Sequence, residues 1–181
     1  MTEADPDATL VGRCLHGDLE AFGVLMERYQ RQVFSAVLHM VGNYEDASEL
    51  SQQIFMKAFE NLRTYDVNRK FFSWIYRVAM NESINHLKTR RQWEPIQDSL
   101  ATPHAGPADH FESGERSLEI QRAVRALDPI HRAVIVSRHF LDLSYSEAAE
   151  VLGIPEKTFK SRLFEARQLL REALEARGYG R

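Results

Sequence analysis

Apolar residues return every three or four positions along most of this chain of 181 residues, a spacing typical of amphipathic helices. Asp18 is a suitable N-cap for a helix that would end near Gly42, and Asn43 is a suitable N-cap for the next. A third strong helix is predicted over about 70–92, and a weaker one over about 9–15. No stretch of four or more residues alternates as a half-buried strand would. The apolar stripes of the first two strong helices consist of Phe22, Leu25, Met26, Tyr29, Val33, Val37 and Met40, then Ala47, Leu50, Ile54, Phe55, Ala58, Phe59 and Leu62.

Residues 94–118 interrupt this periodicity. The segment holds three prolines and two glycines but few large apolar side chains, so it cannot build a core of its own. Helical periodicity resumes at Leu118 and continues to about Ala176. We therefore predict an all-α protein with two small helical domains, 1–93 and 119–181, joined by a flexible linker.

The charge is divided along the chain, although the formal net charge is only −3. Residues 67–93 carry six lysine or arginine residues against one acidic residue, and residues 94–119 carry six acidic residues against one arginine. Residues 120–181 are again basic. Two basic segments on either side of an acidic one favour two contacts with a polyanion such as nucleic acid. The alternative is that each charged segment is simply a solvated helix face.

Several classes of protein are disfavoured. The longest apolar runs fall far short of a membrane span, and the acidic, polar N-terminus is unlike a secretory signal. A single cysteine and scattered histidines predict no metal site, and no cofactor is expected. Because no phosphate-binding loop or catalytic triad spacing is present either, we expect neither an enzyme nor a small-molecule substrate. The default expectation is a cytoplasmic protein.

The stretch 145–163 predicts a helix-turn-helix in the second domain. Ala149 is the small residue where the two helices would cross, and Gly153 would turn the chain with a positive φ. Ser144 or Ser146 can cap the first helix, while Pro155 suits the start of the second. The inner face of the second helix, taken as 156–171, would be formed by Phe159, Leu163, Ala166 and Leu170.

The outer face of that second helix is basic and polar, as a recognition helix in the DNA major groove would be. A helical hairpin with a solvated basic face is the alternative. The candidate DNA-binding residues are Lys157, Thr158, Lys160, Ser161, Arg162 and Arg167.

The predicted helix 70–92 carries a second polar stripe. Five of its residues lie within about 80° of one another on a helical wheel: Trp74, Arg77, Asn81, Asn85 and Lys88. Tyr76 lies close by. Aromatic rings among cations and amides suit unstacked bases on a phosphate track. The alternative is that aromatic residues such as Trp74 and Phe72 belong to the core. The candidates for this second nucleic-acid surface are Trp74, Tyr76, Arg77, Asn81, Asn85 and Lys88.

The predicted helix 44–62 has a polar edge beside large apolar residues. We interpret it as a protein-docking face, with a solvated helix face as the alternative. Its candidate docking residues are Asp46, Glu49, Leu50, Gln52, Gln53 and Phe55.

Three segments, in order along the chain, resemble motifs of the extracytoplasmic-function sigma factors, the smallest group of the bacterial sigma-70 family. The first is DASELSQQIF at 46–55 and the second is FSWIYRVAMN at 72–81. The third comprises LDP at 127–129, LSYSEAA at 143–149 and KSRLFEAR at 160–167. The resemblance covers roughly residues 8–175.

This resemblance implies a role for each candidate surface. The segment 46–55 would bind core RNA polymerase, helix 70–92 would open and read the −10 promoter element, and the second domain would read the −35 element. Asn81 matches a family residue near the flipped base. The family has no catalytic residue, and its members are commonly held inactive by membrane-anchored anti-sigma factors. Ser48 and Gln53 stand where the family usually has acids, which puts the docking contacts in doubt.

Two other functions remain open from the residues alone. The chain could be a classical DNA-binding regulator that acts by binding alone, or an interaction protein whose helix-turn-helix is vestigial. Run-off transcription with purified core polymerase separates these possibilities, because only a sigma factor would need no other sigma factor present.

Overall fold

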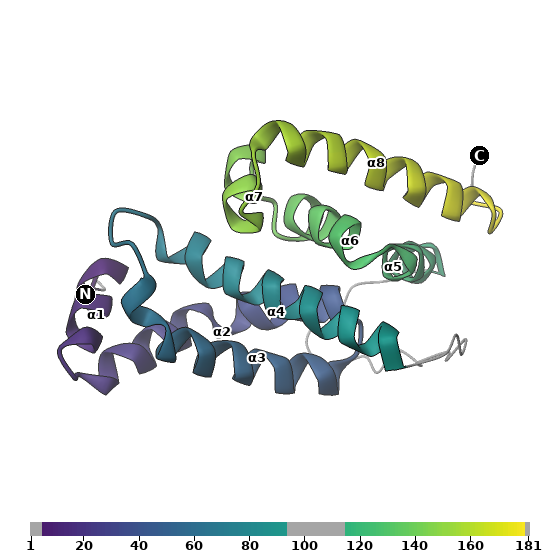
Figure 1. Ribbon diagram of the computed structural model, residues 1–181. Coiled ribbons are helices and arrows are strands. Elements are labelled where there is room, and N and C mark those ends of the chain that lie inside the picture. The colour runs from purple at the N-terminus through teal and green to yellow at the C-terminus, as the bar shows by residue number, and fades with distance from the viewer. Residues whose placement is uncertain (1–4, 94–114, 180–181) are drawn as a thin grey trace.

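The computed structural model describes residues 5–93 and 115–179, and the regular elements in these two ranges are all helical (Figure 1). Most of the predicted linker, 94–114, lies outside the described residues. Its last four residues open a helix instead, because α5 begins at Glu115. The first domain contains α1 (Asp7–Leu15), α2 (Leu19–Val41), α3 (Tyr44–Glu60), η1 (Leu62–Thr64) and α4 (Phe71–Trp93). The second contains α5 (Glu115–Ala126), α6 (Pro129–Ile135), η2 (Val136–Phe140), α7 (Tyr145–Leu152) and α8 (Glu156–Glu175).

The helices α2 and α3 begin where their capping residues predict, and α2 ends where its glycine predicts. The Asp18 carboxylate accepts a hydrogen bond from the backbone N–H of Ala21 at 3.3 Å, and α2 ends at Gly42 with a φ of 88°. The side chain of Asn43 accepts from the N–H of Asp46 at 2.7 Å and so starts α3.

The helix-turn-helix is confirmed in the second domain. Ser144 and Glu147 form a reciprocal capping box at the start of α7. Gly153 ends that helix with a φ of 65°, and the N–H of Ile154 returns to the carbonyl oxygen of Ala149 at 3.0 Å. Ala149 is buried at the crossing of α7 and α8, as its small size predicts.

The cores of the two domains use most of the predicted apolar stripes. Leu25, Ile54 and Ile75 are buried between α2, α3 and α4, and Phe159 and Leu163 are buried on the inner face of α8. The prediction was wrong for Met26 and Phe59, which are 39% and 42% exposed. The apolar face of α2 and α3 is wider than the strip that the rest of the domain covers.

The sequence did not indicate that the two domains pack against each other. In Figure 1, α4 lies between the α2–α3 pair and the second domain, with α6 and α7 against it and α8 outermost. The buried Arg132 of α6 donates a hydrogen bond to the carbonyl oxygen of Met40 at 2.5 Å. Close by, the Arg125 side chain fills the space beside Gly42, where a Cβ would lie 2.8 Å from its Nε.

Candidate nucleic-acid interface

The predicted stripe on α4 lies on a single helix face. Trp74 is half-buried, with its ring 5.5 Å from that of Phe71 and 5.7 Å from that of Tyr65. Further along, Asn81, Asn85 and Lys88 are exposed. The aromatic end of the stripe is therefore held in place by the core, and its polar end is open to solvent.

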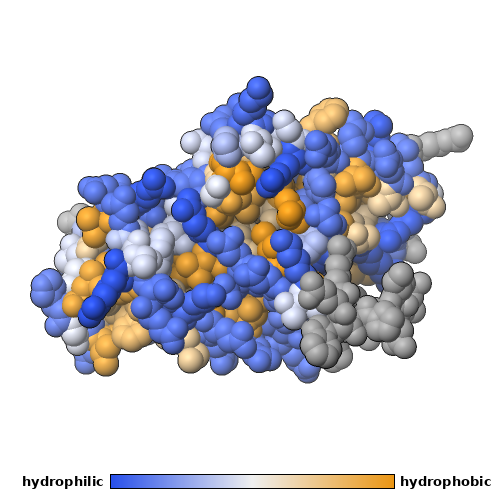
Figure 2. Space-filling view, viewed as in Figure 1, coloured by the Kyte–Doolittle hydropathy of each residue, from blue (hydrophilic) through white to orange (hydrophobic). Residues whose placement is uncertain are grey.

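This stripe forms one wall of a cleft of about 570 Å³ between the two domains. Its other wall comes from the second domain and includes Ile130, Leu152 and Arg162. Figure 2 shows hydrophobic side chains along the boundary between the domains, bordered by hydrophilic ones. The structure thus places Arg162, one of the six predicted recognition-helix residues, opposite the α4 stripe, and leaves the other five outside the cleft lining. The α4 residues that line the cleft are Trp74, Asn81, Asn85 and Lys88.

Tyr76 does not belong to the surface on which the sequence placed it. The residue is 2% exposed, its ring packs 4.5 Å from that of Phe72, and burial raises the pKa of its hydroxyl to about 12. It lies two positions from Trp74, a helical rotation of about 200°, which turns it towards the core. Tyr76 is therefore a core residue and is removed from the candidates.

Arg77 lies at the contact between the domains. Its Nε and Nη2 donate hydrogen bonds to the backbone carbonyl oxygen of Glu150, at 3.2 Å and 2.5 Å. In this arrangement the guanidinium faces α7 instead of solvent.

The predicted recognition helix presents most of its basic residues to solvent. Lys157, Lys160, Ser161 and Arg167 are exposed, while Thr158 and Arg162 are half-buried. Lys160 forms an ion pair with Glu156 at 2.6 Å and lies 5.5 Å from the centre of the Tyr145 ring. Arg167 lies 3.3 Å from Nε2 of His139, and burial, together with Arg167 and Arg138, lowers the pKa of that imidazole.

The predicted docking residues on α3 divide into two sets. Leu50 and Phe55 are 5% and 7% exposed and belong to the core. The polar residues lie on the surface, where Gln53 donates a hydrogen bond to Glu49 at 3.1 Å and Gln52 is exposed. Asp46 forms an ion pair with Arg90 of α4 and lies 3.8 Å from Nε2 of His86.

Sequence reasoning missed an apolar groove of about 790 Å³ between α2 and α3. Met56 is 65% exposed there and Phe59 42% exposed, and the edge of Phe55 reaches the same groove. The signal was present, because Met26, Met56 and Phe59 add apolar surface to helices whose core positions were already filled. The groove is lined by Phe22, Met26, Phe34, Phe55, Met56 and Phe59, with polar residues such as Arg31 and Gln52 at its edge.

Comparison with known protein families gives two matches. Residues 25–93 match the model for sigma-70 region 2, and residues 117–170 match that for sigma-70 region 4. The chain is 32% identical to an ECF RNA polymerase sigma-E factor of Escherichia coli K12, over 94% of this chain and 95% of the relative. The chain belongs to the extracytoplasmic-function sigma factors of the sigma-70 family. It is a protein of promoter-specific transcription initiation.

Other relatives agree with this assignment. The RNA polymerase sigma-H factor of Pseudomonas aeruginosa is 30% identical, over 97% of both chains. The ECF sigma factor SigW of Bacillus subtilis is 29% identical, over 87% of this chain and 91% of the relative. The region 2 match covers the α4 stripe and, except for Phe22, the α2–α3 groove of this sigma factor, and the region 4 match covers its helix-turn-helix motif at 145–163.

Two solved structures share the fold of this sigma factor. CnrH in complex with the cytosolic domain of CnrY superposes with a TM-score of 0.69 at 24% identity, over 95% of this chain and 99% of that chain. The sigma factor RpoE of Bartonella quintana, in complex with the anti-sigma factor NepR, superposes with a TM-score of 0.68 at 20% identity, over 85% of this chain and 96% of that chain.

No described helix of this sigma factor combines the length and the hydrophobicity of a membrane span. Within residues 5–93 and 115–179, no group of histidine, cysteine and acidic side chains is arranged to hold a metal ion.

Proposed function

We propose that this sigma factor binds core RNA polymerase, brings it to promoter DNA and helps to open the duplex, while the polymerase supplies the chemistry. The observation that carries the proposal is the α4 face on which Trp74, Asn81, Asn85 and Lys88 lie together. A half-buried ring beside exposed amides and a cation can hold a displaced base and the phosphate next to it.

In this proposal the two domains read different promoter elements. Residues 1–93 would melt and read the −10 element with the α4 stripe, and residues 119–181 would read the −35 element with α8. The exposed Lys157, Lys160 and Arg167 can reach phosphates, while Ser161 and Arg162 lie on the N-terminal half of α8, which a recognition helix turns towards base edges. The segment 94–118 would connect the two contacts.

Docking on the polymerase would use the α2–α3 groove together with the polar edge of α3. An apolar groove of this size bordered by Arg31 and Gln52 suits an amphipathic partner helix. Leu50 would act by supporting that surface from beneath, while the largely buried Phe55 would present only its edge to the groove.

An anti-sigma factor is a further proposed partner. The two solved structures described above are complexes, and one partner is named as an anti-sigma factor while the other is the cytosolic domain of CnrY. A membrane-anchored anti-sigma factor would hold this protein at the inner face of the membrane. A sigma factor works where the polymerase and the chromosome are, so we place it in the cytoplasm.

Run-off transcription tests the proposal. Purified protein and core polymerase, with no other sigma factor, are expected to produce defined transcripts from a genomic promoter library. The variant Asn81→Ala should lose most of that activity, while the matched control Gln32→Ala, an exposed position on α2 outside the groove, should keep it. Transcripts that appear only when another sigma factor is added would contradict the proposal and favour a classical regulator.

A further inference from the structure

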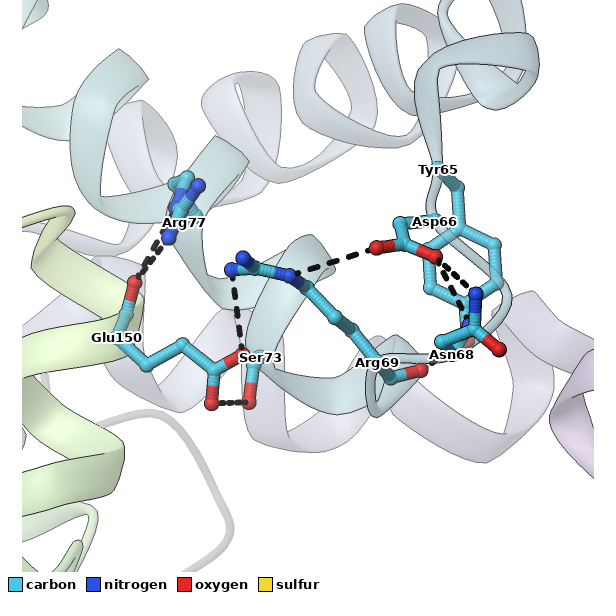
Figure 3. A network of polar contacts seen from close by, with 7 residues as sticks. All are labelled: Tyr65, Asp66, Asn68, Arg69, Ser73, Arg77 and Glu150. Carbon is cyan, nitrogen blue, oxygen red and sulfur yellow. Dashed lines mark hydrogen bonds and ion pairs between the residues drawn. The ribbon is translucent and has the colours of Figure 1, made fainter.

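One side of the helix-turn-helix is in contact with the first domain. At the C-terminal end of α7, the carbonyl oxygen of Glu150 accepts from Arg77, and its carboxylate accepts from the Ser73 hydroxyl at 3.2 Å (Figure 3). The same carboxylate lies 3.8 Å from Nη1 of Arg69. The recognition helix α8 is the outermost helix of the second domain in Figure 1, and its outer face is exposed to solvent. The free surface of the helix-turn-helix is therefore that face of α8.

The outer face of α8 contains an acidic residue that the sequence pattern did not single out. Glu165 is the tenth of the 20 residues of α8, and its side chain is 61% exposed. On a helical wheel it lies about 40° from Ser161 and about 60° from Arg162, one turn further along the helix. The neighbouring Phe164 is 64% exposed, so the rest of the protein does not cover this part of the helix. Glu165 thus lies on the surface that we propose for reading DNA.

The Glu165 carboxylate is held through one of its two oxygens. Its Oε2 lies 3.4 Å from Nε2 of His131, and Nδ1 of the same ring pairs with Asp128. Asp128 is itself fixed, because it accepts hydrogen bonds from the backbone N–H groups of Ile130 and His131 at the start of α6. Within the described part of the chain no donor reaches Oε1 of Glu165. That oxygen can accept a hydrogen bond from a bound molecule.

A carboxylate in the major groove distinguishes bases, because an ionised carboxylate accepts hydrogen bonds and donates none. It cannot be a backbone contact, since the phosphates are themselves negatively charged. Guanine and thymine present acceptors in the major groove, and adenine presents the N7 acceptor beside its N6 amino group. Cytosine presents the N4 amino donor with no acceptor beside it. A carboxylate at position 165 therefore favours cytosine.

We propose that Glu165 is a specificity-determining residue of the recognition helix: Oε1 accepts a hydrogen bond from the N4 amino group of one cytosine in the −35 element, and His131 is the positioning residue that orients the carboxylate. The inference rests on the proposed function, because it assumes that α8 reads the −35 element. An ion pair as exposed as that of Glu165 adds little to stability, so the residue can be replaced in a folded protein.

The test compares the DNA sequences that the wild type and its variants select. Full-length protein with core polymerase retains fragments from a pool of random duplex DNA long enough for both promoter elements, and sequencing of these fragments gives the base preference at each position. The wild type should prefer cytosine by roughly tenfold at one position of the upstream element, as a single good base contact allows. Glu165→Gln should change that preference to adenine, because an amide can pair with both N6 and N7. Glu165→Ala should show no preference there.

Two further variants complete the experiment. The matched control Glu172→Gln makes the same change in net charge as Glu165→Gln at an exposed position near the end of α8, and it should select the wild-type sequence. His131→Gln should weaken the preference for cytosine at the same position and at no other, because the carboxylate loses its orientation. An unchanged preference in His131→Gln would overturn the positioning role. Thermal melting verifies that each variant is folded.

Loss of a negative charge alone would have a different effect, namely tighter binding of all sequences with the same preferred bases. That result for both Glu165 variants would overturn the proposal. So would a change of preference confined to the downstream element, or one at a position where the wild type does not prefer cytosine.

The same selection separates this inference from the proposed function. If the wild type selects two separate elements and the Glu165 variants select the same two unchanged, the role of Glu165 is wrong and the proposed function stands. If the wild type with core polymerase selects no sequence, the proposed function fails, and the inference fails with it.

Discussion

Trp74 and Tyr76 stand two positions apart in α4 and lie in different surroundings. Trp74 lines the cleft between the domains, while Tyr76 points into the first domain and is 2% exposed. Both were candidates for base stacking, because the sequence shows that a ring is present without showing how the helix is rotated. The rotation is set by which neighbours the rest of the domain covers. Ile75, Ala79 and Met80 are buried with Tyr76, and this turns the 74–81–85–88 face outward.

Tyr76 is therefore expected to affect stability and not DNA binding. Tyr76→Ala should lower the free energy of unfolding by about 3–5 kcal/mol, as truncation of a buried aromatic ring does. Tyr76→Phe keeps the ring and should leave run-off transcription close to that of the wild type. Chemical denaturation of both variants measures the first effect. A loss of transcription in a Tyr76→Phe protein of normal stability would show that Tyr76 does belong to the DNA-binding surface.

At the scale of the element, α3 carries two apolar surfaces, one in the core and one in the groove, which the sequence pattern did not distinguish. Its apolar positions form one broad pattern, yet Leu50 and Ile54 lie in the core, while Met56 and Phe59 line the groove against α2. Periodicity predicted that the helix exists and where it starts. It could not divide the apolar face, because the division depends on how far α2 and α4 extend over it. The caps of α2 and α3 and the turn at Gly153 were predicted well, since each depends on a few neighbouring residues.

Because the groove is exposed, its role in polymerase binding can be tested without disturbing the folding of the domain. Met56→Lys places a charge in an exposed apolar site, so the protein should fold normally and lose most of its affinity for core polymerase. The matched control is Glu60→Gln, which makes the same change in net charge on the same helix outside the groove. Pull-down with core polymerase and thermal melting measure the two effects. Normal polymerase binding by folded Met56→Lys would remove the groove from the docking surface.

His131 connects α6 to α8 and makes the second domain sensitive to pH. Its Nδ1 pairs with the Asp128 carboxylate that caps α6, and its Nε2 lies 3.4 Å from Glu165 of α8. Burial alone would lower the pKa of His131, but the two carboxylates outweigh burial and raise it above 6.5. The stabilisation is therefore complete below about pH 6.5 and is lost as the pH rises through the higher pKa of the folded state.

The measurement is the difference in unfolding free energy between the wild type and His131→Gln, followed from pH 6 to pH 8. The difference should shrink as the pH rises. Taking a difference matters because His139, whose pKa is lowered by burial and by Arg167 and Arg138, contributes in the opposite direction in both proteins. A difference that stays constant or grows with pH would show that the Asp128–His131–Glu165 contacts do not favour the protonated ring.

At the scale of the whole molecule, the two domains were predicted and their packing was not. Periodicity and the break after Trp93 depend on local composition, which the sequence displays directly. The packing depends on residues far apart in the chain, such as Arg132 with Met40 and Arg125 with Gly42. Nothing in a single sequence marks a buried arginine as the partner of a distant carbonyl group. For the same reason the sequence predicted two DNA surfaces and not the cleft in which Arg162 of one faces the α4 stripe of the other.

Arg132 should couple the unfolding of the two domains. Arg132→Met removes the donors to the carbonyls of Met40 and Leu127 while keeping much of the volume. Leaving such acceptors unpaired should lower the free energy of unfolding by roughly 3 kcal/mol. Calorimetry should show one transition for the wild type and two for the variant, as the first domain then unfolds alone. A single transition at the wild-type temperature would show that Arg132 does not couple them.

The bond between Arg77 and α7 ends on a backbone carbonyl, and this has a consequence for evolution. Every amino acid at position 150 presents the same oxygen, so mutation of that residue changes the Glu150 carboxylate contacts and spares the carbonyl one. Correlated substitutions between positions 77 and 150 would then be faint among relatives, even where the contact persists. Natural selection has to preserve Arg77 and the turn of α7 that positions the carbonyl oxygen of residue 150. A shift of α7 would therefore weaken the contact even where residues 77 and 150 are both unchanged.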